Sequence, residues 1–200
     1  MIDHVTYYYR TDTPPFQSLS GLPKEEAIAI MRTLADDSNY GARFKDPEGY
    51  MSSRKAAEGW VRQAFIAKGG KPHAEYPIAM VLGESPWLVR STPDINRHGE
   101  LRIPLSIFNE TDISFTYPDS MISYWFGQEQ PAGLYHPELH GHVFLRSEIL
   151  AIIAERGMPE GSWNTHLPDN LAPYIEAQVW NHELLEPFRN GAPIGKERIR

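Results

Sequence analysis

The 200-residue chain contains no cysteine. This absence excludes disulfide scaffolds, thiol nucleophiles and zinc or iron–sulfur sites that are built on cysteine. A chain without cysteine fits the reducing cytoplasm, and we therefore expect a cytoplasmic protein. Residues 1–12 hold no basic region followed by an apolar run, so the sequence does not predict a signal peptide.

Long apolar runs and an excess of positive charge are also missing. No run approaches the roughly 20 apolar residues that are needed to span a bilayer. The formal net charge is −7, and an acidic surface repels both phosphate backbones and anionic lipids. We therefore expect neither a nucleic acid nor a membrane as partner, and a small-molecule nucleotide is the partner class that stays open.

Sequence signatures of several common enzyme classes are absent. The chain has no GxxxxGK[ST] phosphate-binding loop, no GxGxxG after an expected strand, no GxSxG nucleophile elbow and no HExxH zinc motif. The pair Gly69–Gly70 lies between lysines, but it follows an expected helix. A phosphate cradle uses the N-terminus of a helix, so we interpret this pair as a helix stop.

Size and composition predict one globular domain. Hydrophobic residues make up 41% of the chain and aromatic residues 12%, which is typical of a chain that buries a core. At 200 residues a single domain is the expectation. We place this domain at residues 1–188, and we expect residues 189–200, which lack any periodicity, to form a loose tail.

The order of the expected elements favours an α+β fold. Strands are expected over 4–11, 76–83, 99–108, 112–117, 142–144 and 173–180, and helices from Pro23, from Pro47, over 118–127 and over 147–157 with Ser147 as cap. Pro104 suggests an edge or a bulge, because proline lacks the N–H that a central strand needs. Two early helices followed mostly by strands predict a mixed or mostly antiparallel sheet with short inserted helices.

A cluster of histidines suggests a metal site. The stretch "LYHPELHGHVF" holds four potential ligands, His136, Glu138, His140 and His142. Imidazole and carboxylate groups suit zinc, iron, manganese or nickel. If the stretch is a strand, this spacing puts all four on one face, although Pro137 and Gly141 can break it. Solvent-facing or sheet-packed histidines are the alternative.

Two further stretches combine polar and apolar residues with strand periodicity. Ser114 and Thr116 share one face of an expected strand, and Glu176 and Gln178 share one face of another. A carboxylate such as Glu176 stabilises positive charge that develops at an anomeric carbon. Arg10 closes the first strand and can hold a phosphate. Solvated strand faces and a surface ion pair are the plain alternatives.

Several stretches resemble, in order, a family of uncharacterised bacterial proteins with no established activity. They are "YPIAMVLGESPWL", "IPLSIFNETDISFTYPDSM", "HGHVFLRSEI" and "PYIEAQVWNHE", and together they cover roughly residues 75–185. The resemblance implies membership of that family and does not imply a function.

A second resemblance is to ADP-ribosyltransferase-like proteins, in which a first-strand Arg, a Ser-x-Thr strand and a late glutamate strand converge on NAD. Here Arg10, the pair Ser114 and Thr116, and the pair Glu176 and Gln178 follow in that order. The family pattern ends in the catalytic glutamate, whereas here glutamate precedes glutamine. The resemblance implies an NAD- or nucleotide-handling enzyme with Glu176 as catalytic residue and Arg10, Ser114, Thr116 and Gln178 as binding residues.

Three function classes therefore stay open. The first is the nucleotide- or NAD-handling enzyme. The second is a metal-binding protein or metal-dependent enzyme that uses the histidine cluster. The third is a non-enzymatic binding module whose polar strand faces are solvated. The sequence does not identify a cofactor, and it does not decide whether the protein is an enzyme.

Overall fold

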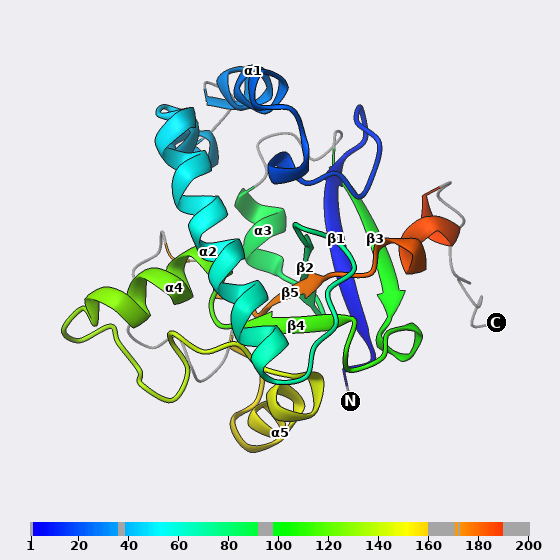
Figure 1. Ribbon diagram of the computed structural model, residues 1–200, viewed down its shortest axis with the longest axis vertical. Coiled ribbons are helices and arrows are strands. Elements are labelled where there is room, and N and C mark those ends of the chain that lie inside the picture. Colours follow the sequence, from blue (N-terminus) through cyan, green and yellow to red (C-terminus); the bar gives the residue numbers. More distant parts are fainter. Residues whose placement is uncertain (1, 36–38, 92–97, 160–170, 172, 190–200) are drawn as a thin grey trace.

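The structure is a computed structural model that describes residues 2–35, 39–91, 98–159, 171 and 173–189. Its centre is one sheet of five strands in the order β3-β1-β2-β5-β4, and every neighbouring pair is antiparallel. The strands are β1 (His4–Arg10), β2 (Ile78–Leu82), β3 (His98–Pro104), β4 (Ile113–Thr116) and β5 (Glu176–Val179). With helices around this sheet, the predicted α+β class is confirmed (Figure 1).

Pro104 lies where its missing N–H does least harm. It is the last residue of β3, and β3 is an edge strand of the sheet. The expectation of an edge position is therefore correct. The chain then turns into a short 3₁₀ helix, η4 (Leu105–Ile107), so the strand that was expected to reach residue 108 ends earlier.

The long helix α2 (Pro47–Ala67) crosses one face of the sheet (Figure 1). The Asp46 side chain accepts a hydrogen bond from the backbone N–H of Gly49 at 3.0 Å, and Pro47 is the first helical residue. The helix ends before Gly69, whose φ of 93° suits glycine. The start from Pro47 and the glycine stop that the sequence predicted are confirmed.

The remaining helices surround the sheet. They are α1 (Lys24–Ala35), α3 (Pro86–Ser91), α4 (Ser120–Glu129) and α5 (Arg146–Arg156), with the short 3₁₀ helices η1 (Leu19–Gly21), η2 (Asn39–Phe44) and η5 (His182–Phe188). Ser147 is not the cap of α5, contrary to expectation. Leu145 precedes the helix and donates its backbone N–H to Glu148 at 2.8 Å, while the hydroxyl of Ser147 donates to Glu110.

The main hydrophobic core lies on the face of the sheet opposite α2. Phe115 and Ala177, from neighbouring strands, contribute to it, and Ile149 packs there from α5. On the α2 side, Phe65 of the helix stacks on Trp180, which follows β5, with ring centroids 6.2 Å apart. A purely apolar strand pair would be expected between two such layers, yet the α2 side of β4 and β5 is polar.

Three further expectations concern a membrane span, the strand at 142–144 and the C-terminal tail. Within the described ranges, no helix is both long and apolar enough to cross a membrane. The expected strand at 142–144 is reduced to a single bridge between Phe144 and Phe115. The expected loose tail falls almost wholly on residues 190–200, which lie outside the described residues.

Candidate functional site

The polar face of β4 and β5 brings together four of the five residues that the sequence singled out for an NAD site. Thr116 lies opposite Glu176, and Ser114 lies opposite Gln178. Glu176 keeps an exposed fraction of 8%, and the other three side chains have 1% or less. These residues are therefore buried under α2 and are not a solvated strand face.

A continuous hydrogen-bond network joins the four side chains. The Trp180 indole N–H donates to Ser114 Oγ at 2.9 Å, and Ser114 Oγ donates to Gln178 Oε1 at 2.9 Å. The Gln178 amide Nε2 then donates both to Thr116 Oγ1, at 2.8 Å, and to Glu176 Oε1, at 3.1 Å. Both N–H groups of the Gln178 amide are occupied, so the network fixes the orientation of the amide and directs one of these N–H groups at the carboxyl group.

Glu176 is the ionisable end of this network. Burial, and to a smaller extent the nearby charge of Asp119, raise the pKa of the Glu176 carboxyl group to about 7. Hydrogen bonds from Gln178 and Ser120 and the positive charge of Arg54 act in the opposite direction. A carboxyl group with such a pKa exists in both protonation states near neutral pH, which is the requirement for proton transfer.

Asp119 supplies the second carboxyl group and also caps α4. Its Oδ1 accepts hydrogen bonds from the backbone N–H groups of Met121 and Ile122, both at 3.1 Å. Burial raises the pKa of Asp119, while the amide hydrogen bonds and the charge of Arg43 lower it. The helix start therefore fixes one carboxyl group close to another, which is the arrangement that separates the two pKa values of a pair.

Arg54 of α2 brings positive charge to the same region. Its Nη2 lies 2.9 Å from Glu58 Oε1, and its Nε donates to Ser20 Oγ at 3.0 Å. The side chain has an exposed fraction of 19%. Burial alone would lower the pKa of Arg54, but Tyr50 and the Glu58 carboxylate raise it, so the guanidinium is charged at all accessible pH values. Glu58 in turn has a raised pKa because it is buried.

Arg10 is not part of this set, contrary to the sequence-based expectation. Thr6, Val81 and Glu176 lie side by side across β1, β2 and β5. Arg10 is four residues further along β1, about 13 Å along the strand and about 10 Å across it from Glu176. Its Nη2 instead pairs with Asp12 at 2.7 Å, at a position that is partly exposed. The structure supplies positive charge beside Glu176 from Arg54.

The histidine segment does not form the strand on which the metal hypothesis depended. Residues 132–134 and 137–141 are turns. The four expected ligands, His136, Glu138, His140 and His142, are therefore not aligned on one face. Pro137 and Gly141 break the extended geometry, and Gly141 has a φ of 76°.

Three of these side chains have polar contacts of their own. Glu138 Oε1 pairs with Arg156 at 3.0 Å, and His142 Nε2 lies 2.7 Å from the carbonyl oxygen of Pro137. His140 is buried, and its Nδ1 accepts a hydrogen bond from the backbone N–H of His136 at 3.0 Å. The described part of the chain contains no group of three or more His, Asp or Glu residues that could hold a metal ion.

Arg54, Glu58 and the position of Asp119 beside Glu176 were not predicted from the sequence. One signal was available for the first two residues. Glu58 lies next to Ala57 and three residues before Val61 in the buried stripe of α2, and Arg54 is four residues earlier, where it can pair with it. Asp119 lies at the start of the helix expected over 118–127, and nothing in the sequence shows that this helix start lies beside β5.

Comparisons with known proteins do not provide a template for this site. No protein-family model, no curated protein and no solved structure matches the chain. What the site does must therefore be inferred from its own carboxyl groups, amides and arginines.

Proposed function

We propose that the protein is an enzyme that acts on NAD or a related nucleotide, with Glu176 as its catalytic carboxyl group. The observation that carries this proposal is the buried network of Trp180, Ser114, Gln178 and Thr116, which ends at Glu176 beside Asp119. A fold keeps such a polar group between two packed layers at a cost in stability, and perturbed carboxyl groups of this kind concentrate at functional sites.

The roles of the neighbouring residues follow from their contacts. Ser114, Thr116 and Gln178 are bonded to one another and buried, so they position Glu176 and do not bind the substrate directly. Arg54 takes the role that sequence analysis gave to Arg10. Its charge, at a partly buried site, favours the phosphates of a nucleotide.

Glu176 would act on the bond between ribose C1′ and the nicotinamide nitrogen. As that bond breaks, its electron pair leaves with the nicotinamide, and positive charge develops at C1′. The ionised Glu176 carboxylate stabilises this charge. A water molecule then forms the new C–O bond, and its proton passes to the carboxylate and on to solvent, which gives ADP-ribose, nicotinamide and one proton.

Release of nicotinamide from NAD by the purified full chain tests this proposal. We expect Glu176→Gln to lower the rate at least about 100-fold, because glutamine keeps the hydrogen bond from Gln178 but cannot carry charge. The matched control is Glu129→Gln, at an exposed position at the end of α4. Its rate should equal that of the unchanged protein.

The pH profile provides a second readout. Since the ionised form of Glu176 is the active one and burial raises its pKa to about 7, the rate should rise as pH increases through 7. If the full chain does not bind NAD at millimolar concentration, or if Glu176→Gln releases nicotinamide as fast as the unchanged protein, the proposal is wrong.

A further inference from the structure

The two edges of the central sheet differ in length and in cover. β4, at one edge, has four residues, and its Phe115 exchanges two backbone hydrogen bonds, of 2.9 and 2.8 Å, with Phe144 on the outer side. β3, at the other edge, has seven residues, and within the described ranges no strand pairs with its outer side (Figure 1). Proteins usually protect an edge by shortening the strand or by placing charges or proline on it. Since β3 is not short, its charges decide what it can pair with.

The outer side of β3 offers unused backbone groups. The N–H of Leu105 donates to the carbonyl oxygen of Asp3 at 2.8 Å, which sets the alternation of the ladder between β1 and β3. Hydrogen-bonded pairs alternate along an antiparallel ladder, so Leu101 also bonds towards β1, whereas the N–H and C=O groups of Glu100 and Arg102 point away from β1. No described residue forms a hydrogen bond with these outward groups. A further strand can therefore bond to them.

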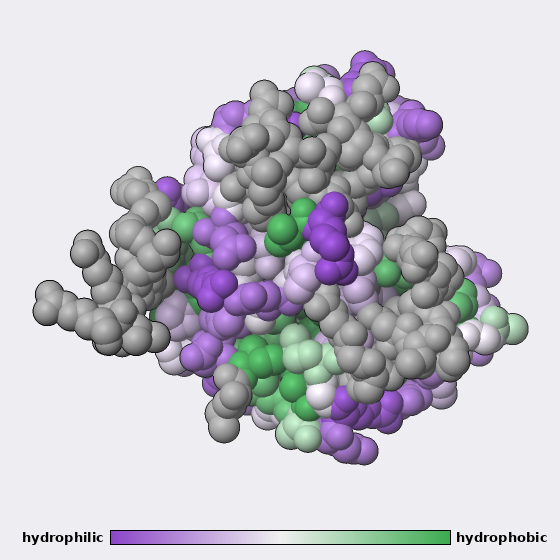
Figure 2. Space-filling view, turned by 180° about the vertical axis from the view of Figure 1, so that it is seen from behind, coloured by the Kyte–Doolittle hydropathy of each residue, from purple (hydrophilic) through white to green (hydrophobic). Residues whose placement is uncertain are grey.

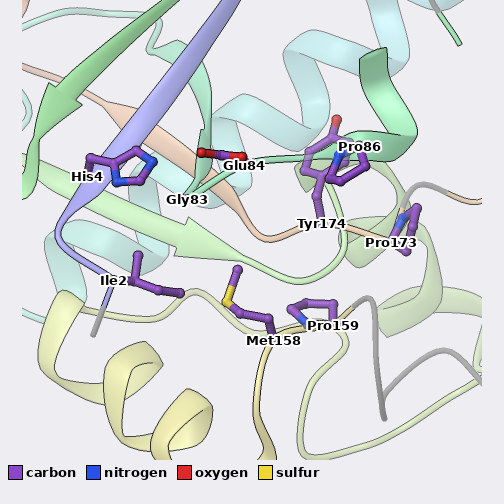
Figure 3. A pocket seen from close by; sticks show the side chains of 9 residues that line it. All are labelled: Ile2, His4, Gly83, Glu84, Pro86, Met158, Pro159, Pro173 and Tyr174. Atoms are coloured by element: carbon purple, nitrogen blue, oxygen red, sulfur yellow. The ribbon is translucent and has the colours of Figure 1, made fainter. Parts of the chain in front are cut away.

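The exposed side chains of this edge carry opposite charges. Glu100 and Arg102 have exposed fractions of 39% and 54%, and because they are two residues apart they lie on the same face of the sheet. Arg102 Nη2 lies 2.7 Å from Oε1 of Glu84, which lines a cavity beside His4 (Figure 3), and 3.4 Å from Oε1 of Glu100. Seen from behind, hydrophilic residues lie at the height of β3 in Figure 1, and hydrophobic surface gathers lower (Figure 2). Charge and backbone, more than apolar surface, are what this edge presents.

We propose that β3 pairs antiparallel with β3 of a second copy of the chain and joins the two sheets into one across a two-fold axis. Leu101 lies opposite its own copy at the centre of this pairing. Glu100 then lies opposite the partner's Arg102, and Arg102 lies opposite the partner's Glu100, so the outward backbone groups of both residues find donors and acceptors. Because the contact is symmetric, each pair occurs twice.

The charges select this register from its neighbours. A shift of the two strands by two residues would place Glu100 opposite its own copy in one direction and Arg102 opposite its own copy in the other. Like charges directly opposite each other are destabilising, whereas opposite charges stabilise a strand pair. The selected register also aligns the two strands over their full length. It does not depend on the function proposed for Glu176, because β1 and β2 separate β3 from β5.

Sedimentation of the full chain at concentrations up to millimolar tests the pairing, and we expect a dimer. Arg102→Glu sets carboxylates opposite each other and should raise the dissociation constant at least about 10-fold. Adding Glu100→Arg to it restores opposite charges and should return the constant to within about 3-fold of the original. Arg156→Glu is the matched control, because it makes the same change and also breaks an ion pair, with Glu138 at 3.0 Å. A monomer at every concentration, or a double variant as weak as Arg102→Glu, would overturn the proposal.

A single introduced thiol tests the register, because the chain has no cysteine of its own. In the proposed pairing the Cα atoms of the two central residues are about 4.5 Å apart, within the range that a disulfide spans. Leu101→Cys should therefore form a disulfide-linked dimer under mild oxidation. Ser106→Cys, at an exposed position just beyond the strand, does not face its own copy and should stay largely unlinked. If Leu101→Cys cross-links no better than Ser106→Cys, any dimer uses another surface and the proposal is wrong.

Discussion

Asp119 lies close enough to Glu176 for its charge to raise the pKa of the Glu176 carboxyl group. The two residues come from different elements, since Asp119 caps α4 and Glu176 begins β5. Two carboxyl groups in one buried place cannot both ionise freely, so the protein holds a proton there that the unfolded chain would release. Stability and pH are therefore linked at this site.

The first prediction concerns that link. The pKa of Glu176 rises from 4.5 to about 7, so the folded chain binds more protons than the unfolded chain between these values, and its stability falls as pH rises through them. Glu176→Gln removes this loss. Relative to the unchanged protein, the variant should gain up to about 3 kcal/mol in free energy of unfolding between pH 4 and pH 8. Urea denaturation across that pH range measures this gain. A difference in free energy of unfolding between the variant and the unchanged protein that stays constant with pH would contradict the prediction.

The second prediction separates the charge of Asp119 from its capping role. Asparagine caps helices nearly as well as aspartate does, so Asp119→Asn should leave α4 in place. Without the neighbouring charge, the pKa of Glu176 should fall, which carboxyl-carbon NMR follows directly. Asp46→Asn makes the same exchange at the cap of α2 and serves as control. An unchanged titration of Glu176 in Asp119→Asn would show that burial alone sets its pKa.

Local sequence signals identified much of the fold. Asp46, Pro47 and Gly69 mark the ends of α2 through capping and backbone preference, which depend only on neighbours in the chain. The alternation around Ser114 and Glu176 likewise predicted which residues share a face. Strand order is different, because it depends on how the sheet assembles. For this reason Arg10 was assigned to a site that lies two strands away from β1.

In the histidine segment, too, the spacing of residues was not enough to predict the structure. His136 and His142 have a spacing that suits a strand, but Pro137 and Gly141 control the backbone and produce turns. The buried pair of Arg54 and Glu58 was missed because two charged residues on a helix usually indicate its solvated face. The structure shows that both side chains are largely buried and face inward.

The third prediction tests the network behind Glu176. Replacing Gln178 with methionine keeps the size of the side chain but removes the partner of Ser114 Oγ and of Glu176 Oε1. Because these groups stay buried, we expect a loss of about 2–4 kcal/mol in free energy of unfolding. Gln128→Met, at an exposed position on α4, is the matched control and should change stability little. A similar loss in both variants would show that the network contributes nothing specific.

The last prediction concerns His140, whose pKa is lowered to about 4 because burial disfavours its charged form. The unfolded chain then binds a proton from pH 6.5 downwards while the folded chain does not, so stability falls as pH decreases from 6.5 to about 4. This change of stability with pH has the opposite sign to that caused by Glu176, so the two changes offset each other in the unchanged protein. His140→Asn should remove this dependence of stability on pH. The difference in free energy of unfolding between the unchanged protein and the variant should therefore be smaller at acidic pH than at neutral pH, by up to about 3 kcal/mol. The control His73→Asn, at an exposed histidine, should keep the same dependence of stability on pH as the unchanged protein. If the stability difference between His140→Asn and the unchanged protein does not vary with pH, His140 is not the origin of the pH dependence.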